Sequence, residues 1–484
     1  MTNFFGYSFD TPWFFTNYSF LVVLGFFLLV YSLLYNKDLL RKLYLIIFSL
    51  FFYYKSSGPF LIIFILLILG DYNFAKYIER IKSTRARKFL LIFSILISLS
   101  FLLYFKYSGF FLMNVNELFS MNFVIEKLFL PIGISFYTFQ SISYIVDVYQ
   151  GKIKSSSNFV DYAFYMTFFP HLVAGPIVRA SDFIPQINNP LQVDRALLKT
   201  ALFRIVLGFS KKLIIADFLG KFVDIVHSNP KLYSGVENLI SMYAYSFQIY
   251  FDFSGYSDIA IGIALLMGYK LNENFDRPYA SQNITDFWRR WHISLSTWLR
   301  DYIYIPLGGS RTGKFNTYLF LMITMTVGGF WHGASWNFVL WGVLHGVALV
   351  VHKLISSTTP KAVQKKTPVV LKCINLFVTF NFVSVLWILF RAQSFNDSIN
   401  SIRKIALDIR FSDFVGFYFA RKEVLFMLLA AVLLVFLNKN IKLFLERIFV
   451  KTPLLVILIF LIVFLQLALQ IKSTDIAPFI YFQF

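Results

Sequence analysis

One histidine between two uncharged segments is the first candidate for chemistry. His332 lies in the sequence GGFWHGASWN, residues 328–337. A buried imidazole needs hydrogen-bond partners, and glycines allow a second backbone or a substrate to come close. An ionisable side chain at membrane depth is a functional candidate by default. Because an imidazole with a pKa near ~6.5 acts as a base at neutral pH, we predict that His332 is catalytic.

A second segment, residues 283–302, combines arginines with tryptophans. Read as one helix, it places four apolar residues on one face: Phe287, Trp291, Leu295 and Trp298. Its arginines lie largely off that face: Arg289, Arg290 and Arg300. Two interpretations stay open. The segment is either an interfacial packing helix whose arginines extend to water, or a basic surface that attracts an anionic donor such as the phosphates of coenzyme A.

For the other polar residues the sequence favours a structural role over catalysis or metal binding. His345 and His352 are seven apart on a predicted span, but no carboxylate joins them, so we predict helix packing and no metal site. Asp252 and Asp258 are six apart in an apolar stretch and do not share a helical face, so we expect them to make polar contacts within the fold. Cys373 is the single cysteine, which permits no intramolecular disulfide.

The composition places these residues in a membrane protein. Of 484 residues, 58% are apolar and only 14% are charged, yet the formal net charge is +20. A soluble domain has about a quarter of its residues charged. A membrane explains both facts, because Lys and Arg collect in cytoplasmic loops while apolar runs fill the bilayer. The basic charge therefore does not indicate a nucleic-acid partner, and we expect the lipid bilayer to be the surrounding medium.

Uncharged runs long enough to cross a bilayer recur along the chain. With weaker candidates included, we predict ten to twelve membrane helices in an all-α fold; the clearest runs are 18–35, 89–105, 128–146, 315–331, 335–351, 373–390 and 452–470. No basic residue precedes Lys37, so we expect the N-terminus outside. The basic residues between 439 and 451 are expected inside, which places the tail 472–484 outside.

No repeat or long linker divides the sequence, so we predict a single membrane domain over 1–484. Its middle, about 129–350, is richer in Gly, Pro, His, Trp and charge than either flank. Polar groups inside a membrane protein are costly unless they face protein or water. This region is therefore the predicted site.

Four motifs in this order resemble the membrane-bound O-acyltransferases, in their bacterial branch of alginate and peptidoglycan O-acetyltransferases. They are FFPHLVAGPIVR at 168–179, QIYFDFSGYSDIAIG at 248–262, the segment from Phe287 continued to Arg311, and WHGASW at 331–336. Together they extend over about half of the chain. Position 171 departs from the pattern, since His171 stands where Gln is expected, so we do not count it as a catalytic residue.

The resemblance implies a fold and a set of roles. The fold would be a ring of tilted helices with a central tunnel that narrows near the histidine. The resemblance makes His332 the intramembrane catalytic histidine and His292 the second histidine of the signature. It also implies acetyl-CoA as the donor, with Arg289, Arg290, Arg300 and Arg311 at the cytoplasmic approach.

The C-terminal tail carries one further candidate. Phe479, Tyr481 and Phe484 match the F-x-Y-x-x-F ending of the single-span partner of the related D-alanyl transferase. One interpretation is an aromatic tail resting at the interface. The other is a tail folded into the outer funnel, where Tyr481 takes the acetyl group with His332 as general base. A phenol with a pKa near ~10 needs such a base to become a nucleophile.

These observations predict an inner-membrane O-acyltransferase that passes acetyl groups from cytoplasmic acetyl-CoA towards an extracytoplasmic polysaccharide. In the branch that it resembles, a separate exported transferase of the SGNH-hydrolase kind completes the transfer, so such a partner is expected. Two alternatives stay open: direct acylation or D-alanylation of a lipid-linked or teichoic polymer, and a secondary transporter. Against the transporter, no pair of matching Gly- or Pro-broken spans is visible in the two halves.

Overall fold

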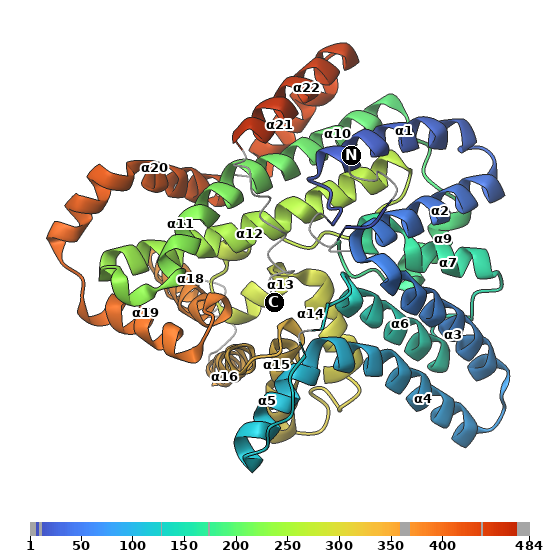
Figure 1. Cartoon of the computed structure of the whole chain (residues 1–484), viewed down its shortest axis with the longest axis horizontal. Coiled ribbons are helices and arrows are strands. Elements are labelled where there is room, and N and C mark those ends of the chain that lie inside the picture. Colours follow the sequence, from blue (N-terminus) through green and yellow to red (C-terminus); the bar gives the residue numbers. More distant parts are fainter. Residues whose placement is uncertain are drawn as a thin grey trace. The chain divides into compact units, whose positions relative to one another are not determined.

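The computed structural model describes residues 6–8, 12–126, 128–172, 175–358, 368–436 and 439–471, and these residues form helices without a strand (Figure 1). They divide into two compact units. The first unit comprises Met1–Ile205 and Ile259–Asn272, and the second comprises Val206–Asp258 and Glu273–Phe484. Helices α10 (Arg195–Phe209) and α12 (Gly235–Leu266) contribute to both. The prediction of an all-α fold is confirmed.

Several helices are suited to a bilayer. Among the described residues, five stretches are long and apolar enough to cross a membrane: Asp38–Arg80, Thr84–Phe119, Gly235–Leu266, Trp336–Ser357 and Val369–Arg391. A sixth is added if Phe411–Phe436 and Asn440–Lys451 form one bent span. The chain is a polytopic membrane protein. The larger number of ten to twelve membrane helices, and the tunnel, stay predictions.

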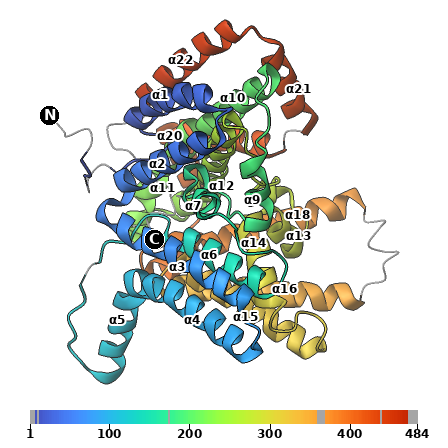
Figure 2. The same ribbon diagram turned by 90° about the vertical axis from the view of Figure 1, so that its right-hand side faces the viewer.

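The first unit has an aromatic core. Its elements are α1 (Tyr18–Leu34), α2 (Asp38–Ser57), η1 (Gly58–Phe60), α3 (Leu61–Arg80), α4 (Thr84–Leu102), η2 (Leu103–Tyr107), α5 (Ser108–Phe119), α6 (Ile134–Tyr149), α7 (Phe159–Thr167), α8 (Phe169–Leu172) and α9 (Ala180–Asn188). Figure 2 shows α3, α4 and α6 side by side. The buried ring of Phe169 packs edge-on against Phe48 and Phe27, at centroid distances of 5.1 and 5.9 Å. Large rings thus fill the centre of this unit.

The second unit holds the segments singled out for chemistry. Its further elements are η3 (Ser210–Ala216), α11 (Asp217–Ser228), η4 (Pro230–Leu232), η5 (Pro278–Ala280), α13 (Ile284–Arg290), α14 (Ile293–Leu299), η6 (Arg300–Tyr304), α15 (Lys314–His332), α16 (Trp336–Thr358), α18 (Val369–Arg391), α19 (Phe395–Leu407), α20 (Phe411–Phe436), α21 (Lys439–Lys451) and α22 (Leu454–Ile471). Figure 2 shows α21 and α22 in red, following α20 along the chain.

The reading of 283–302 as one helix is wrong. The helix breaks between α13 and α14, where His292 adopts a left-handed backbone conformation with φ of +42°. Such a conformation is uncommon for a non-glycine residue and ends the first helix. The four apolar residues predicted to share a face are nevertheless all buried: Phe287, Trp291, Leu295 and Trp298. Two short helices therefore bury the four apolar side chains that one longer helix was expected to bury.

Helices α15 and α16 approach each other through glycines. A Cβ atom built on Gly329 would lie 2.8 Å from the Cα of Gly342, closer than side-chain atoms ever come. At Gly346 a Cβ would lie 3.0 Å from Met322 Sδ. Small residues are the usual means by which membrane helices pack backbone to backbone. This contact brings the end of α15, with His332, against α16.

Two neighbouring lysines of η3 are paired with carboxylates. Lys211 Nζ lies 2.6 Å from Asp258 Oδ2, while Lys212 Nζ lies 2.5 Å from Asp252 Oδ1 and 2.8 Å from Asp217 Oδ1. The side chains of Lys212 and Asp252 are only 4% and 3% exposed. Buried charges persist in a protein only when they are paired. The prediction that Asp252 and Asp258 make polar contacts within the fold is confirmed.

Replacing Lys212 with Met is expected to destabilise the protein strongly, because it leaves two carboxylates without their buried cation. Removal of one partner of a buried pair costs about 3–5 kcal/mol in the free energy of unfolding. Thermal unfolding of the full chain in detergent measures this loss. The control is Lys404→Met, which removes a partly exposed ion pair with Asp408 and is expected to shift the unfolding midpoint much less. An equal shift in both variants would contradict the prediction.

Candidate active site

His332 is enclosed by aromatic rings from three helices. It is the last residue of α15 and is 3% exposed. Its ring centroid lies 5.0 Å from Trp331, 5.1 Å from Trp341 of α16 and 5.1 Å from Phe390 of α18. Rings at these distances and steep angles make edge-to-face contacts, which fix the orientation of the imidazole. The predicted catalytic histidine therefore lies in a small, apolar enclosure.

A second buried histidine extends this cluster along α16. His345 lies one helical turn after Trp341, and the two ring centroids are 4.6 Å apart. Trp288 Nε1 of α13 donates a hydrogen bond of 3.3 Å to His345 Nδ1. The ring of Phe287 lies nearly parallel to His345, at 9° and 6.2 Å. The expectation that His345 packs within the helices is confirmed.

His292 lies at the break between α13 and α14 and is completely buried. Asn274 Oδ1 lies 3.2 Å from His292 Nδ1 and also accepts hydrogen bonds from the backbone N–H and the hydroxyl of Ser294. Since a carbonyl oxygen only accepts, His292 Nδ1 is the donor and Nε2 keeps its lone pair. Burial lowers the pKa of His292 to about 3, so the ring is neutral at physiological pH.

The two histidines of the predicted signature contact the same side chain. The ring of Trp331 lies 5.0 Å from His332 and 6.3 Å from His292. His292 is thus one aromatic ring removed from His332, and it also packs edge-on against Phe253 of α12 at 4.7 Å. In this arrangement His292 supports the aromatic enclosure of His332 from the side of α12.

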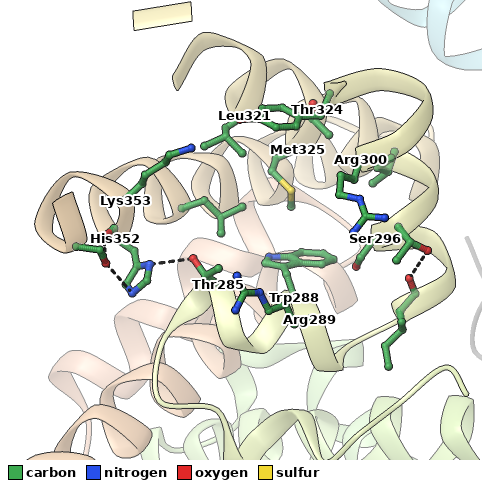
Figure 3. Close-up of a pocket in the computed structure, with 16 residues that line it drawn as sticks. Thr285, Trp288, Arg289, Ser296, Arg300, Leu321, Thr324, Met325, His352 and Lys353 are labelled. Carbon is green, nitrogen blue, oxygen red and sulfur yellow. Dashed lines mark hydrogen bonds between the residues drawn. The ribbon is translucent and has the colours of Figure 1, made fainter. Parts of the chain in front are cut away.

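A cavity of about 780 Å³ lies between α13, α14, η6, α15 and α16, and Trp288, the hydrogen-bond partner of His345, is one of its lining residues. Figure 3 shows how its side chains lie: Lys353 of α16 and Arg300 of η6 extend toward it from opposite sides, and Arg289 lies beside Trp288. His352 Nδ1 is hydrogen-bonded to the Thr285 hydroxyl at 2.8 Å. The remaining lining residues are apolar side chains, among them Leu321, Met325 and Leu349, mixed with hydroxyl groups of serine, threonine and tyrosine.

The cavity has the charge to bind an anion. Arg289 and Arg300 are exposed, so their guanidinium groups are accessible, and Lys353 adds a third cation. Arg300 is engaged by Asp301, whose Oδ1 lies 2.6 Å from Arg300 Nε; this hydrogen bond and the nearby charge raise the pKa of Arg300. Guanidinium and ammonium groups around an apolar cavity suit a ligand with phosphates at one end and an apolar chain at the other.

Comparison with known proteins decides the family. The sequence model of the membrane-bound O-acyltransferase family matches residues 152–392, which contain the whole cluster around His332. The protein named "Probable alginate O-acetylase AlgI" from Pseudomonas aeruginosa is 42% identical over 360 residues, covering 73% of this chain and 67% of that protein. The chain belongs to the membrane-bound O-acyltransferase family. It is therefore an acyltransferase, as the four motifs predicted.

Two further relatives bear on the branch of the family. The peptidoglycan O-acetyltransferase of Helicobacter pylori is 38% identical to this acyltransferase, over 82% of this chain and 79% of that protein. The teichoic acid D-alanyltransferase of Streptococcus thermophilus is 32% identical, over 54% of this chain and 68% of that protein. The O-acetyltransferases thus match this acyltransferase over more of its length and at higher identity.

The structure brings together some of the predicted site residues and leaves others apart. Arg289 and Arg300 line the cavity, whereas Arg290 pairs with Asp286, at 2.8 Å between Nε and Oδ1, and Arg311 is exposed after η6 without lining the cavity. Tyr481 and the tail 472–484 lie outside the described residues. His171 is buried in the first unit, with its ring centroid 5.4 Å from Phe168 and 5.5 Å from Phe183.

Several residues of the cavity were not found from the sequence. Lys353 was not considered, and His352 was assigned only to packing, although its ring is hydrogen-bonded at the cavity wall. A signal was present for His352, which follows His345 by seven residues and so shares its face of the helix, whereas Lys353 lies about 80° away from that face. The family motifs end before this turn of α16 and therefore gave no guidance there.

The buried, neutral state of His292 predicts a pH dependence of stability. The folded pKa of about 3 lies below the unfolded value near ~6.5, so the unfolded chain binds a proton that folded His292 does not. The contribution is complete above about pH 6.5 and is lost as the pH falls toward 3, at up to about 1.4 kcal/mol per pH unit. His292→Asn is expected to lose less stability over this range in thermal unfolding in detergent. Identical slopes for the two proteins would contradict the assignment.

Proposed function

We propose that this acyltransferase takes acetyl groups from cytoplasmic acetyl-CoA and passes them across the membrane for O-acetylation of an extracytoplasmic polysaccharide of the alginate or peptidoglycan kind. The observation that carries the proposal is the enclosure of His332 against α16, the helix that also lines a cavity with three cationic side chains, in a chain similar to O-acetyltransferases of both polymers. Acetyl-CoA is made in the cytoplasm, whereas envelope polysaccharides mature outside the membrane. The acetyl group therefore has to cross the membrane.

The donor is inferred from the cavity. Arg289, Arg300 and Lys353 would bind the phosphates of coenzyme A, and the apolar lining would accept the chain that carries the thioester. Arg290 and Arg311 have no such position at the cavity, so we retain them only as basic residues near its approach. The second candidate, D-alanylation of a teichoic polymer, has less support because the D-alanyltransferases match over only about half of this chain.

In the proposed reaction His332 acts as general base and Tyr481 as the first acceptor. The phenol oxygen attacks the thioester carbonyl carbon, a C–O bond forms, and His332 takes the phenol proton. The C–S bond then breaks, and the coenzyme A thiolate leaves and takes the proton back from His332. The product is an acetylated tyrosine and free coenzyme A. His292 contributes by holding Trp331 against His332.

The proposal includes a partner and a location. An extracytoplasmic transferase of the SGNH-hydrolase kind would take the acetyl group from the tail and place it on a polymer hydroxyl. The protein would lie in the inner membrane, with its N-terminus and its C-terminal tail outside, since basic residues collect on the cytoplasmic side.

His332→Ala is expected to abolish acetyl transfer, because removal of a general base costs about 10²–10⁴-fold in rate. The measurement is polymer-bound acetate in cells, with membrane insertion of the variant verified by fractionation. The matched control is His171→Gln, at a buried histidine of the first unit that belongs neither to the His332 enclosure nor to the cavity, and it is expected to retain substantial activity. Normal acetylation by His332→Ala would exclude His332 as the general base.

Tyr481→Phe is expected to remove polymer acetylation while leaving the protein inserted, because the phenol oxygen is the proposed acceptor. Mass spectrometry of the wild-type tail should detect acetate on Tyr481. Tyr418→Phe, at an exposed tyrosine of α20, is the control for loss of a hydroxyl group. Unchanged acetylation in Tyr481→Phe would exclude the covalent step and leave direct transfer to the polymer.

A further inference from the structure

A row of residues along α16 leads from His332 to the basic cavity. Trp341 contacts His332, and His345, Leu349 and Lys353 follow at steps of four residues, each about 40° further around the helix axis. Leu349 and Lys353 line the cavity. Twelve residues separate Trp341 from Lys353, which corresponds to about 18 Å along the helix axis at 1.5 Å per residue. This stripe of residues thus winds from the proposed reaction centre to the cations.

The inner end of this stripe carries two buried N–H donors. The hydrogen bond from Trp288 Nε1 occupies the Nδ1 lone pair of His345 and therefore fixes the ring as the tautomer that carries its proton on Nε2. Within the described part of the chain, neither His345 Nε2 nor Trp341 Nε1 has a hydrogen-bond partner. Both residues are at most 1% exposed. A buried donor without an acceptor costs free energy and calls for an explanation.

The pantetheine arm of acetyl-CoA has hydrogen-bond acceptors for these two N–H groups. Its pantetheine arm carries two amide carbonyls and ends in the thioester carbonyl, so it offers acceptors along an otherwise apolar chain. From sulfur to the first phosphate the extended arm spans roughly 16 Å, at the reach per bond of an extended peptide. This length matches the stripe, with the phosphates at Lys353 and the thioester at His332.

We propose that Trp341 and His345 bind the pantetheine arm of the donor by donating hydrogen bonds from Nε1 and Nε2 to its carbonyl oxygens, while Lys353 binds a phosphate at the other end. The inference rests on the proposed function in taking acetyl-CoA as the donor. Trp341 and His345 are positioning residues, since no covalent bond to them forms or breaks in the reaction. Trp288 lines the cavity and covers His345, so entry of the arm requires the Trp288 ring to move aside.

The test compares two donors on the full chain in detergent: acetyl-CoA, and S-acetyl-pantetheine, which has the arm but no phosphate. Release of the first equivalent of free thiol, followed under single-turnover conditions, gives the maximal acylation rate constant and the half-saturating donor concentration for each, written here as kcat and KM. His345→Phe keeps the aromatic packing but loses the N–H group, and we expect its KM to rise about tenfold with both donors. His345→Gln retains an N–H donor and is expected to recover part of that loss. Trp341→Phe should behave like His345→Phe.

Lys353→Gln is expected to affect only the donor that carries phosphates. Its KM is expected to rise about tenfold with acetyl-CoA alone, because S-acetyl-pantetheine has no phosphate for Lys353 to bind. Lys372→Gln, at an exposed lysine of α18, is the control for loss of a positive charge. Thermal unfolding midpoints of all variants verify that each is folded.

The outcomes separate this inference from the proposed function. An unchanged KM in His345→Phe and Trp341→Phe with both donors would overturn the inference while leaving acetyl-CoA as donor. A fall in kcat alone, without recovery in His345→Gln, would also overturn it and indicate a packing role. If the wild-type protein releases no thiol from acetyl-CoA and does not bind coenzyme A in equilibrium dialysis, the proposed donor is wrong and the inference fails with it.

Discussion

The backbone contact between α15 and α16 sets the geometry on which the candidate site depends. Because Gly329 and Gly342 have no side chains, the two helices meet closely enough for His332 to contact Trp341. The row of α16 residues that continues from Trp341 then leads to the basic cavity, past His345 and its hydrogen bond with Trp288. A single added methyl group at either glycine would separate the helices and move the imidazole away from its aromatic enclosure. The chemistry of the site is therefore tied to helix packing and not to a mobile loop.

A second feature of this apolar interior is the hydrogen bonding of the polar groups at its helix break. At the break between α13 and α14, Asn274 Oδ1 receives three donors, from His292 Nδ1 and from the backbone and side chain of Ser294. The left-handed turn at His292 exposes backbone groups that a continuous helix would satisfy by itself. One amide oxygen thus stabilises both the turn and the tautomer of the histidine.

The sequence predicted the residue types of the site better than their arrangement. The buried set from Phe287 to Trp298 was identified correctly, because helical spacing is a local signal. His332, which its glycine and tryptophan neighbours make a candidate, lies in an aromatic enclosure, and its catalytic role stays a prediction. The break at His292 was missed, since no proline or glycine marks it and the turn depends on Asn274, eighteen residues earlier. Arg290 was grouped with Arg289 although it pairs with Asp286, four residues before it on the same helix. The residues Asn229 and Pro230 favour a solvated loop around His227, yet His227 is buried at the end of α11. These differences arise from tertiary contacts, which no pattern in the sequence records.

The buried ion pairs of η3 and α12 also bear on how the protein enters the membrane. Helix α12 carries Asp252 and Asp258 within a candidate span, and a carboxylate at the centre of a lone span costs about 2.5–3.5 kcal/mol on insertion. Their partners, Lys211 and Lys212, precede them in the chain and are synthesised first. When α12 emerges, the two lysines that pair with it have already been synthesised. The order of synthesis therefore favours capture of α12 by the preceding helix, and the two segments are best regarded as one unit of insertion.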